Sequence, residues 1–431
     1  MVLVLGFVRV WKAPGTPFDE HTHFDYVVKI AQNLRLPPMS DLLGQTALQA
    51  WACTDAPAFA GLECGAAVQN PSNAPWQGLS TATGYMPWYY VMTGLATRAV
   101  HDLPEDASWL EAARAVSVGW LGLLALLVTS IVRRLGGNNI LAFSTALILC
   151  TMPLVLMQGA AVNPDVPATA LALSAVWIWL ATSNWTPSLR LVSAGSVGLI
   201  AVMAKESAVA GLLVVAFLEA GARGRAYLAD SRERERQREP RPATTSVWRS
   251  ALPSVAMLVF LGVTYMVLRL KVMPSLRESG VDLPGAIPAE ESVDLSGWVK
   301  EATLYALESL AVSPEGVLGG EWFRLPPTIL AFCAIGGVVF AILRSPTPWR
   351  ATLLESVAQG TGLYLLLFPA LMLLFLDWQG NYLFFQPRYV LPGMALAVIA
   401  FFAGARWGWS LVLGAASLAL WLATLRELLA M

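Results

Sequence analysis

Residues 115–132 read Ala-Val-Ser-Val-Gly-Trp-Leu-Gly-Leu-Leu-Ala-Leu-Leu-Val-Thr-Ser-Ile-Val, and Arg133-Arg134 follow them directly. These 18 positions carry no charged side chain. As a helix they would be about 27 Å long, close to the ~30 Å thickness of a bilayer's hydrocarbon core. The stretch therefore predicts a transmembrane helix that ends in a basic pair.

Apolar runs of the same kind recur along the chain. The further predicted spans are 139–161, 166–182, 190–204, 207–221, 251–270, 327–343, 352–376, 390–404 and 408–425. The apolar segment 1–11 is about half a bilayer long, and we interpret it as an incomplete first helix. Together these segments predict an all-α, polytopic transmembrane helical bundle of about 11 spans.

The composition agrees with a membrane protein. Apolar residues make up 56% of the chain and charged residues only 13%, against about 25% charged residues in a typical soluble domain. This balance excludes a soluble enzyme and a disordered protein. The net charge of −1 gives no general attraction to nucleic acid.

The distribution of arginine predicts the orientation. Segment 222–249 holds eight Arg and four acidic residues, which predicts a disordered, solvated loop on the cytoplasmic side. Counting spans from it places 12–114 and 271–326 outside, and each carries a net charge of about −5. The predicted parts are a partial first transmembrane helix (1–11), an outer loop with juxtamembrane helices and an acidic motif (12–114), transmembrane helices (115–221), the basic cytoplasmic loop (222–249), a transmembrane helix (250–270), an outer loop (271–326) and transmembrane helices (327–431).

The stretch 85–100 is ambiguous. It is apolar but short, and Pro87 and the rings of Trp88, Tyr89 and Tyr90 interrupt it. Aromatic rings suit the membrane interface. We therefore favour an amphipathic element on the outer surface over a further span.

An acidic motif follows the first half-helix, with the sequence Pro17-Phe-Asp-Glu-His-Thr-His-Phe-Asp-Tyr26. Its carboxylates and imidazoles suit a general base or a divalent-ion site. In a helix, Asp19 and His23 would lie on one face. The simpler alternative is a hydrophilic helix entry capped by Asp19.

Two polar groups interrupt the apolar segments in the middle of the chain. Asn163-Pro164-Asp165 joins two predicted spans, and its simpler interpretation is a turn. Lys205-Glu206 lies in a stretch without other charges from Leu191 to Phe217. Adjacent helical residues do not face each other, so either each of this pair has its own partner or one of them snorkels to the interface. Lys205 is therefore either a phosphate ligand or half of a structural ion pair with another helix.

A third polar group, Gln386-Pro387-Arg388-Tyr389, precedes the span at 390–404. Arg388 has the geometry to bind a phosphate. The alternative is an isolated arginine at the interface.

The cysteines divide into two kinds. Cys53 and Cys64 lie in a polar segment and could pair if that segment faces an oxidising compartment. Cys150 and Cys333 lie inside apolar runs, as buried hydrophobic residues do.

In their order along the chain, these motifs resemble those of the GT-C superfamily of integral-membrane glycosyltransferases. The resemblance is to the bacterial branch with a Pro-Asp-Glu-x-x-His-Phe signature after the first helix, and here one residue is inserted after the proline. The other pieces that carry it are Gly84–Tyr90, Arg114–Gly136, Asn163-Pro164-Asp165, Ala204-Lys205-Glu206, Gly319–Phe323 and Gln386–Tyr389. The last motif usually reads Gly-Arg-Tyr, so Pro387 is a departure.

The resemblance implies a GT-C-like fold and transfer of a sugar from a polyprenyl-phosphate donor to a glycan, lipid or protein acceptor. It implies the bacterial cytoplasmic membrane, with the active site facing outside and membrane lipid around it. Asp19 would act as general base with His21 or His23. Glu20 belongs to the same catalytic set, and Asp165 would support the base. Direct displacement would invert the anomeric configuration.

The implied binding residues fall into three groups. Donor-phosphate contacts carry over to Lys205, Arg388 and Tyr389. Residues lining the lipid and substrate are Tyr85, Trp88, Tyr89, Tyr90, Asn163 and Gln386. Asp19, Glu20 and Asp165 suit an optional Mg²⁺, Mn²⁺ or Ca²⁺, and the histidines also admit a transition metal.

The sequence is also compatible with two other classes of membrane protein. Charged residues inside spans also mark the pathways of secondary transporters and lipid flippases. A non-catalytic subunit with the same fold is the second alternative. The chain departs from the family pattern in two features, because its first helix is short and no soluble domain follows Met431. We therefore expect the outer loops or a partner subunit to bind the acceptor.

Overall fold

The computed structural model describes residues 1–12, 19–38, 41–54, 59–103, 108–236, 247–272, 287–288, 336–340, 343, 352–379, 381–382, 391–404 and 407–430. Their α-helices are α1 (Val2–Lys12), α2 (Glu20–Asn33), α3 (Gln45–Ala52), α4 (Trp88–His101), α5 (Trp109–Arg134), α6 (Asn139–Thr151), α7 (Pro153–Ala160), α8 (Asp165–Ala181), α9 (Pro187–Ala204), α10 (Val209–Arg236), α11 (Val247–Val272), α14 (Leu353–Gln379), α15 (Leu391–Ala403) and α16 (Trp407–Ala430). Short 3-10 turns are η2 (Pro71–Asn73), η3 (Pro75–Gly78), η4 (Thr81–Gly84) and η5 (Glu206–Ala208). Strands β1 (Ile287–Pro288) and β2 (Asn381–Tyr382) pair antiparallel.

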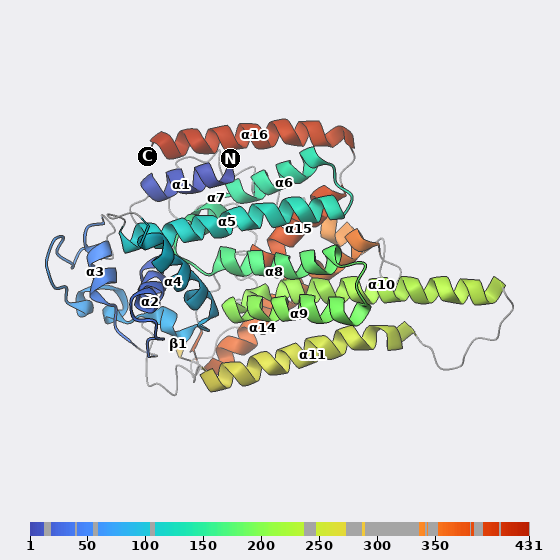
Figure 1. Ribbon diagram of the computed structural model, residues 1–431, viewed down its shortest axis with the longest axis horizontal. Coiled ribbons are helices and arrows are strands. Elements are labelled where there is room, and N and C mark those ends of the chain that lie inside the picture. Colours follow the sequence, from blue (N-terminus) through green and yellow to red (C-terminus); the bar gives the residue numbers. More distant parts are fainter. Residues whose placement is uncertain are drawn as a thin grey trace.

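The long helices lie side by side in one bundle (Figure 1). Helix α5 packs against α1, α4, α6 and α8, and α10 packs against α8, α9, α11 and α14. Helices α2, α3 and α4 gather at one end of the bundle, which we call the α2–α4 end. The last turns of α10 project from the opposite end, the α10 end (Figure 1). Apart from the two short strands, the regular structure of the described residues is helical, which confirms the all-α prediction.

The predicted spans coincide with helices wherever the structure describes them, but the count of 11 is not confirmed. Among the described residues, three helices are long and apolar enough to cross a membrane. They are Trp109–Arg134, Pro187–Ala204 and Glu206–Arg234. Shorter apolar helices are Asp165–Ala181, Leu391–Ala403 and Leu411–Arg426. Predicted span 327–343 lies largely outside the described residues, as do outer loop 271–326 and Cys333.

Predicted span 139–161 is bent. Helices α6 and α7 meet at an angle of 72° and together would count as a fourth span. Pro153 occupies the first turn of α7. A proline lacks the N–H that α6 would need in order to continue, and it disfavours helical geometry at the residue before it. The bend therefore follows from one residue inside an otherwise apolar run.

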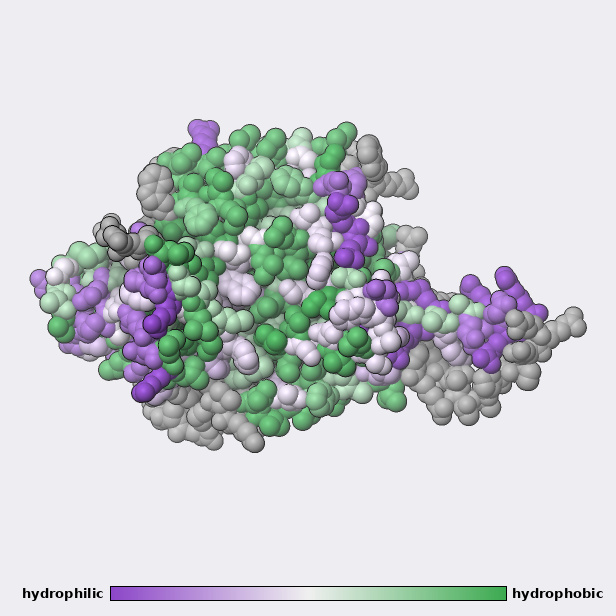
Figure 2. All heavy atoms as spheres, viewed as in Figure 1, coloured by the Kyte–Doolittle hydropathy of each residue, from purple (hydrophilic) through white to green (hydrophobic). Residues whose placement is uncertain are grey.

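The surface of the bundle has the distribution expected for a membrane protein. Figure 2 shows mainly hydrophobic residues across its middle, with hydrophilic residues gathered over the α2–α4 end and over the α10 projection. In water such a belt would be costly, whereas hydrocarbon surrounds it at no such cost. The belt and the apolar helices indicate that the chain is a membrane protein.

The basic segment 222–249 differs from its prediction as a disordered loop, because α10 continues as far as Arg236. Its charges alternate at helical spacing. Arg234 pairs with Asp230 at 2.9 Å, and Arg223 pairs with Glu219 at 2.6 Å, both four residues apart. Pairs at this spacing, on residues of high helix propensity, extend a helix that its apolar part has already nucleated.

Helix α4 covers most of the ambiguous stretch 85–100. It has 14 residues and a length of about 21 Å, less than the ~30 Å hydrocarbon core. Its buried residues pack against α2 in a core formed with Phe24, Trp51 and Tyr90. Length and packing both favour an element at the end of the bundle over a span.

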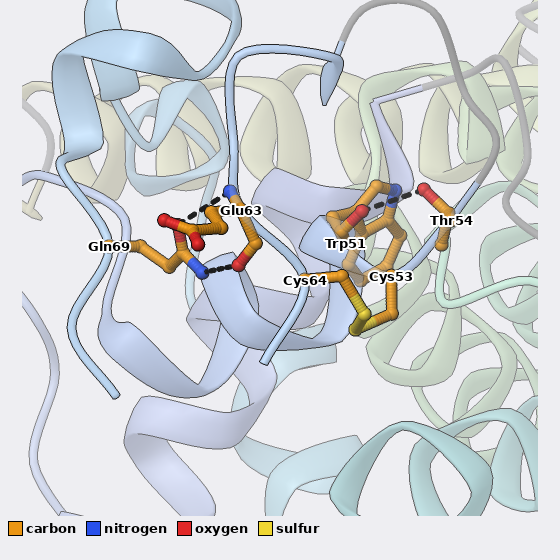
Figure 3. The surroundings of a disulfide bond; sticks show 6 residues. All are labelled: Trp51, Cys53, Thr54, Glu63, Cys64 and Gln69. Carbon is orange, nitrogen blue, oxygen red and sulfur yellow. Dashed lines mark hydrogen bonds between the residues drawn. A yellow bond between two sulfur atoms is a disulfide. The ribbon is translucent and has the colours of Figure 1, made fainter. Parts of the chain in front are cut away.

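Cys53 and Cys64 form a disulfide beside α3 (Figure 3). On one side, Thr54 folds back and its N–H and hydroxyl both donate to the Trp51 carbonyl, at 3.0 and 2.8 Å. On the other side, the Gln69 amide bonds both the N–H and the carbonyl of Glu63 (Figure 3). The bridge therefore joins two segments whose ends each carry local hydrogen bonds.

We expect loss of this disulfide to destabilise the α2–α4 end. For a loop of this length, a cross-link contributes about 3 kcal/mol by restricting the unfolded chain. Cys53→Ala/Cys64→Ala should therefore unfold at a lower temperature than the wild type when intrinsic tryptophan fluorescence reports unfolding. Cys150→Ala is the control for loss of a buried, unpaired cysteine. Equal unfolding temperatures for the double variant and the wild type would contradict the expectation.

Candidate functional site

Glu20, the second acid of the motif, is held in a buried ion pair. Arg114 of α5 donates through Nε to Oε1 at 2.8 Å and through Nη2 to Oε2 at 2.7 Å. The backbone N–H of Val162 donates to the same Oε1 at 3.0 Å. Both partners are buried. This arrangement ties the start of α2 to α5 and to the turn between α7 and α8, which is a structural role.

The third acid, Asp25, is also engaged. It pairs with Lys29 at 2.8 Å and accepts the Gly44 N–H at 2.7 Å. Lys29 in turn contacts Asp41 at 2.8 Å. Burial raises the pKa of Asp25, while Lys29 and the Gly44 hydrogen bond lower it. This network fixes the loop at 41–44 against α2.

Asp19 has a different environment from the two other acids. It is half-buried and stands at the N-cap of α2. Its backbone carbonyl accepts hydrogen bonds from Thr22 and His23, but its side chain makes no capping hydrogen bond. The interpretation of Asp19 as a helix cap is therefore wrong. Of the motif's carboxylates, Asp19 is the one with partial access to solvent.

The two histidines of the motif separate. His23 Nδ1 lies 2.8 Å from the Tyr90 hydroxyl, and its ring stacks on that of Tyr90. Burial raises the pKa of Tyr90 well above its ordinary value, and Tyr85, Tyr89 and Asp165 raise it further. The phenol therefore stays protonated and holds the orientation of His23.

His21 points instead into an aromatic pocket. Its ring lies edge-on to Phe59, with ring centroids 5.0 Å apart, and is tilted against Trp51. Burial lowers its pKa to about 4, although Asp19 and Glu20 act in the opposite direction. His21 is therefore neutral in the folded protein at pH 7.

We expect this burial to make stability pH-dependent. Above pH 6.5, His21 is neutral in both the folded and the unfolded state and has no effect. Between pH 6.5 and about 4, the unfolded state takes up the proton first, so folding loses up to about 3 kcal/mol. Thermal unfolding of the wild type and His21→Phe across this range should show a steeper loss in the wild type. Parallel curves would contradict the expectation.

Asp165 and Lys205 form a second buried ion pair, with Lys205 Nζ donating to Asp165 Oδ1. Asp165 begins α8, and its N–H bonds the Asn163 side chain at 2.9 Å, so the turn predicted for Asn163-Pro164-Asp165 is present. Lys205 lies in extended backbone between α9 and η5. The sequence left a phosphate ligand and a structural pair open for Lys205, and this geometry is that of the structural pair.

Glu206 has a partner of its own. It accepts a hydrogen bond of 2.6 Å from the Tyr265 hydroxyl of α11. The expectation that Lys205 and Glu206 bond separate partners is therefore confirmed. The two side chains join the interruption between α9 and α10 to α8 on one side and to α11 on the other.

The residues predicted to line a lipid or substrate lie in different environments. Trp88 is exposed and Tyr85 half-buried. Tyr89, Tyr90 and Asn163 are fully buried, so these three cannot face lipid as the structure stands. Gln386, Arg388 and Tyr389 lie outside the described residues, as does Gly319–Phe323.

The predicted divalent-ion ligands do not form a group. In the part of the chain that the structure describes, no three His, Cys, Asp or Glu side chains are placed to hold a metal ion. The acceptor atoms of Glu20 already bond Arg114 and Val162, which explains why Glu20 does not join Asp19 and Asp165. As the structure places them, these residues do not fit the ion.

The structure buries two arginines whose environment the sequence did not predict, Arg114 and Arg9. Arg114 lies 94 positions from Glu20 in the chain, so no local spacing could reveal the pair. Arg9 is buried with 2% of its surface exposed, although it lies in an apolar helix. A charged residue inside an apolar run was the available signal for Arg9.

Comparisons with known proteins found few similarities to this chain. No model of a protein family matches it. No curated protein matches it. A solved structure that is similar is the archaeal oligosaccharyltransferase AglB from Archaeoglobus fulgidus, in complex with an inhibitory peptide and a dolichol-phosphate. The two sequences are 13% identical, and the match covers 99% of this chain and 54% of that one, with a TM-score of 0.42. This chain thus spans about half the length of AglB, and a TM-score this low does not establish a common fold.

Proposed function

We propose that the chain is a membrane glycosyltransferase. It moves a sugar from a polyprenyl-phosphate donor to a glycan, lipid or protein acceptor, at the α2–α4 end of the bundle. The observation that carries this proposal is the gathering of ionised groups at this end. Asp19 directly precedes Glu20 of the buried Glu20–Arg114 pair, and the second buried pair, Asp165–Lys205, begins three residues after Val162, whose N–H bonds Glu20. Burying ionised groups is costly, and ionisable residues inside an apolar bundle are typical of functional sites.

The chemistry assigns one step to Asp19. Its carboxylate accepts the proton of the acceptor hydroxyl as the hydroxyl oxygen attacks the anomeric carbon. The bond between that carbon and the phosphate oxygen breaks, and polyprenyl phosphate leaves with the electron pair. Attack from the side opposite the phosphate inverts the configuration. We assign the assisting role to His23, which lies four residues after Asp19 on α2 and is oriented by Tyr90.

Cations at this end stabilise the leaving phosphate. An ammonium group has three donors, so the bond from Lys205 to Asp165 is compatible with a further bond to phosphate. Asp165 then serves to position Lys205. Arg388 and Tyr389 are proposed as additional phosphate ligands on the strength of the sequence motif.

The orientation of the site is also a proposal. The disulfide at the α2–α4 end supports an oxidising compartment, the outside of a bacterial cytoplasmic membrane. The arginine-rich part of α10 lies at the opposite end, which suits the cytoplasmic side. Under this arrangement the donor reaches the site from the outer leaflet.

A lipid flippase or secondary transporter is a second candidate. The interruption at Lys205 between α9 and α10, and the 72° bend between α6 and α7, favour it. Broken helices are common in transporters, where they surround the substrate. In those proteins the site lies near the middle of the membrane, whereas the charged groups described here lie at one end of the bundle.

A donor panel distinguishes the two candidates. The purified protein in lipid nanodiscs is incubated with a series of polyprenyl-phosphate sugars and an acceptor mixture from bacterial envelope, and released polyprenyl phosphate is measured. A transferase releases it with at least one sugar. In sealed vesicles, movement of the intact donor between leaflets without release would instead establish a transporter and overturn the proposal.

A further inference from the structure

Arg9 lies at the interface of α1 and α5. The two helices run antiparallel and approach closely, since a Cβ on Gly6 would come within 2.8 Å of Val118, and one on Gly122 within 2.8 Å of Leu3. The turn after Gly6 therefore faces the turn before Val118. That places Arg9, in the last turn of α1, level with Arg114 of α5. The first turns of α5 lie toward the α2–α4 end (Figure 1).

The guanidinium of Arg9 is buried, and it forms no ion pair of its own among the described residues. Its Nε and Nη1 have no hydrogen-bond partner, and only 2% of the residue is exposed. The charged groups that act on it are Arg114 and Glu20. Glu20 already accepts two bonds from Arg114 and one from Val162. These three side chains therefore carry one positive charge in excess.

This arrangement differs from a structural ion pair. An arginine side chain does not lose its proton in a protein, so it cannot become neutral when it is buried. Burying such a charge without an anion is strongly unfavourable. Arg114 and Lys205 each pair with a carboxylate. Arg9 also requires an anionic partner, yet two of its N–H groups have no hydrogen-bond acceptor. Arg9 is therefore a buried cation that can accept an anionic ligand.

We propose that Arg9 binds the phosphate group of a lipid-linked donor. The face of α1 turned away from α5 exposes Val4 and Phe7, an apolar surface along which a hydrocarbon chain can lie. An anion joined to such a chain can contact this surface while its phosphate reaches the level of Arg9. Arginine is also the side chain best suited to several hydrogen bonds with one phosphate. The identity of the lipid as the sugar donor rests on the proposed function.

Binding is measured without turnover, so that the two proposals are tested separately. The probes are a polyprenyl monophosphate and inorganic phosphate, titrated into the full-length protein in nanodiscs. The variants are Arg9→Gln and Arg9→Lys, and the control is Arg133→Gln, an exposed arginine at the other end of α5. Quenching of tryptophan fluorescence and the rise in unfolding temperature both report binding.

We expect the wild type to bind the polyprenyl phosphate saturably and inorganic phosphate far more weakly. Arg9→Gln should weaken binding by at least about thirtyfold, Arg9→Lys by less, and Arg133→Gln by no more than about twofold. Without ligand, Arg9→Gln should unfold at the same temperature as the wild type or higher, because it removes an uncompensated charge. A purely structural arginine would produce a decrease.

Several results would overturn the inference: wild-type affinity in Arg9→Gln, equal binding of inorganic phosphate, or unfolding of Arg9→Gln at a lower temperature with unchanged binding. If Arg9→Gln does not fold, Arg9→Lys decides, and an unchanged affinity in that variant counts against the inference. Phosphate-lipid binding that depends on Arg9, without sugar transfer by the wild type, would support this site and refute the transferase. Sugar transfer by Arg9→Gln at the wild-type rate and donor affinity would support the transferase and refute this site.

Discussion

Replacing Glu20 with Gln should lower the free energy of unfolding by about 3–5 kcal/mol, the usual effect of removing one partner from a buried ion pair. The substitution keeps the shape of the side chain but leaves the charge of Arg114 without compensation. Arg9 lies beside it, so two uncompensated cations would then share one buried region. Thermal unfolding in nanodiscs, followed by tryptophan fluorescence or by the loss of monodisperse protein, measures the change.

The double variant Glu20→Gln/Arg114→Gln provides the test of cause. It removes both charges, so it should be more stable than Glu20→Gln alone. Glu63→Gln is the matched control, because Glu63 is an exposed acid of the same type at the same end of the bundle. Wild-type stability for Glu20→Gln would show that the pair does not fix α2 to α5, and the geometry of the acidic motif would then need another explanation.

The positions of the helices could be predicted because a membrane leaves the backbone few choices. Every peptide group in hydrocarbon must bond within the chain, so an apolar run of sufficient length becomes a helix. The bend at Pro153 had a visible signal inside predicted span 139–161. The extension of α10 did not, because a high density of charge also describes a disordered loop.

The site was predicted less well than the fold, for a geometric reason. Sequence spacing shows that Lys205 and Glu206 cannot pair with each other, but it does not reveal that Asp165 and Tyr265 are their partners, 40 and 59 positions away. It likewise placed Glu20 with Asp19 as one functional cluster. The structure gives them different environments, since Glu20 forms a buried ion pair with Arg114, whereas Asp19 is half-buried at the N-cap of α2.

Replacing Asp19 with Asn should abolish sugar transfer without unfolding the protein. Loss of a general base typically lowers the rate by about 10²–10⁴-fold. Asp19 is half-buried, and its side chain does not cap α2, so an amide of the same shape should be tolerated. Asp102→Asn is the matched control, because Asp102 is an exposed acid at the end of α4. Unfolding temperatures within about 2 °C of the wild type would show that both variants remain folded.

The most direct test of a sugar-transfer site at the α2–α4 end is the initial rate of polyprenyl phosphate release by three proteins under one condition. Wild type, Asp19→Asn and Asp102→Asn are compared in identical nanodiscs with the donor that the panel identifies. We predict equal rates for the wild type and Asp102→Asn, and a rate at least about 100-fold lower for Asp19→Asn. A folded Asp19→Asn variant that releases polyprenyl phosphate at the wild-type rate would contradict the account.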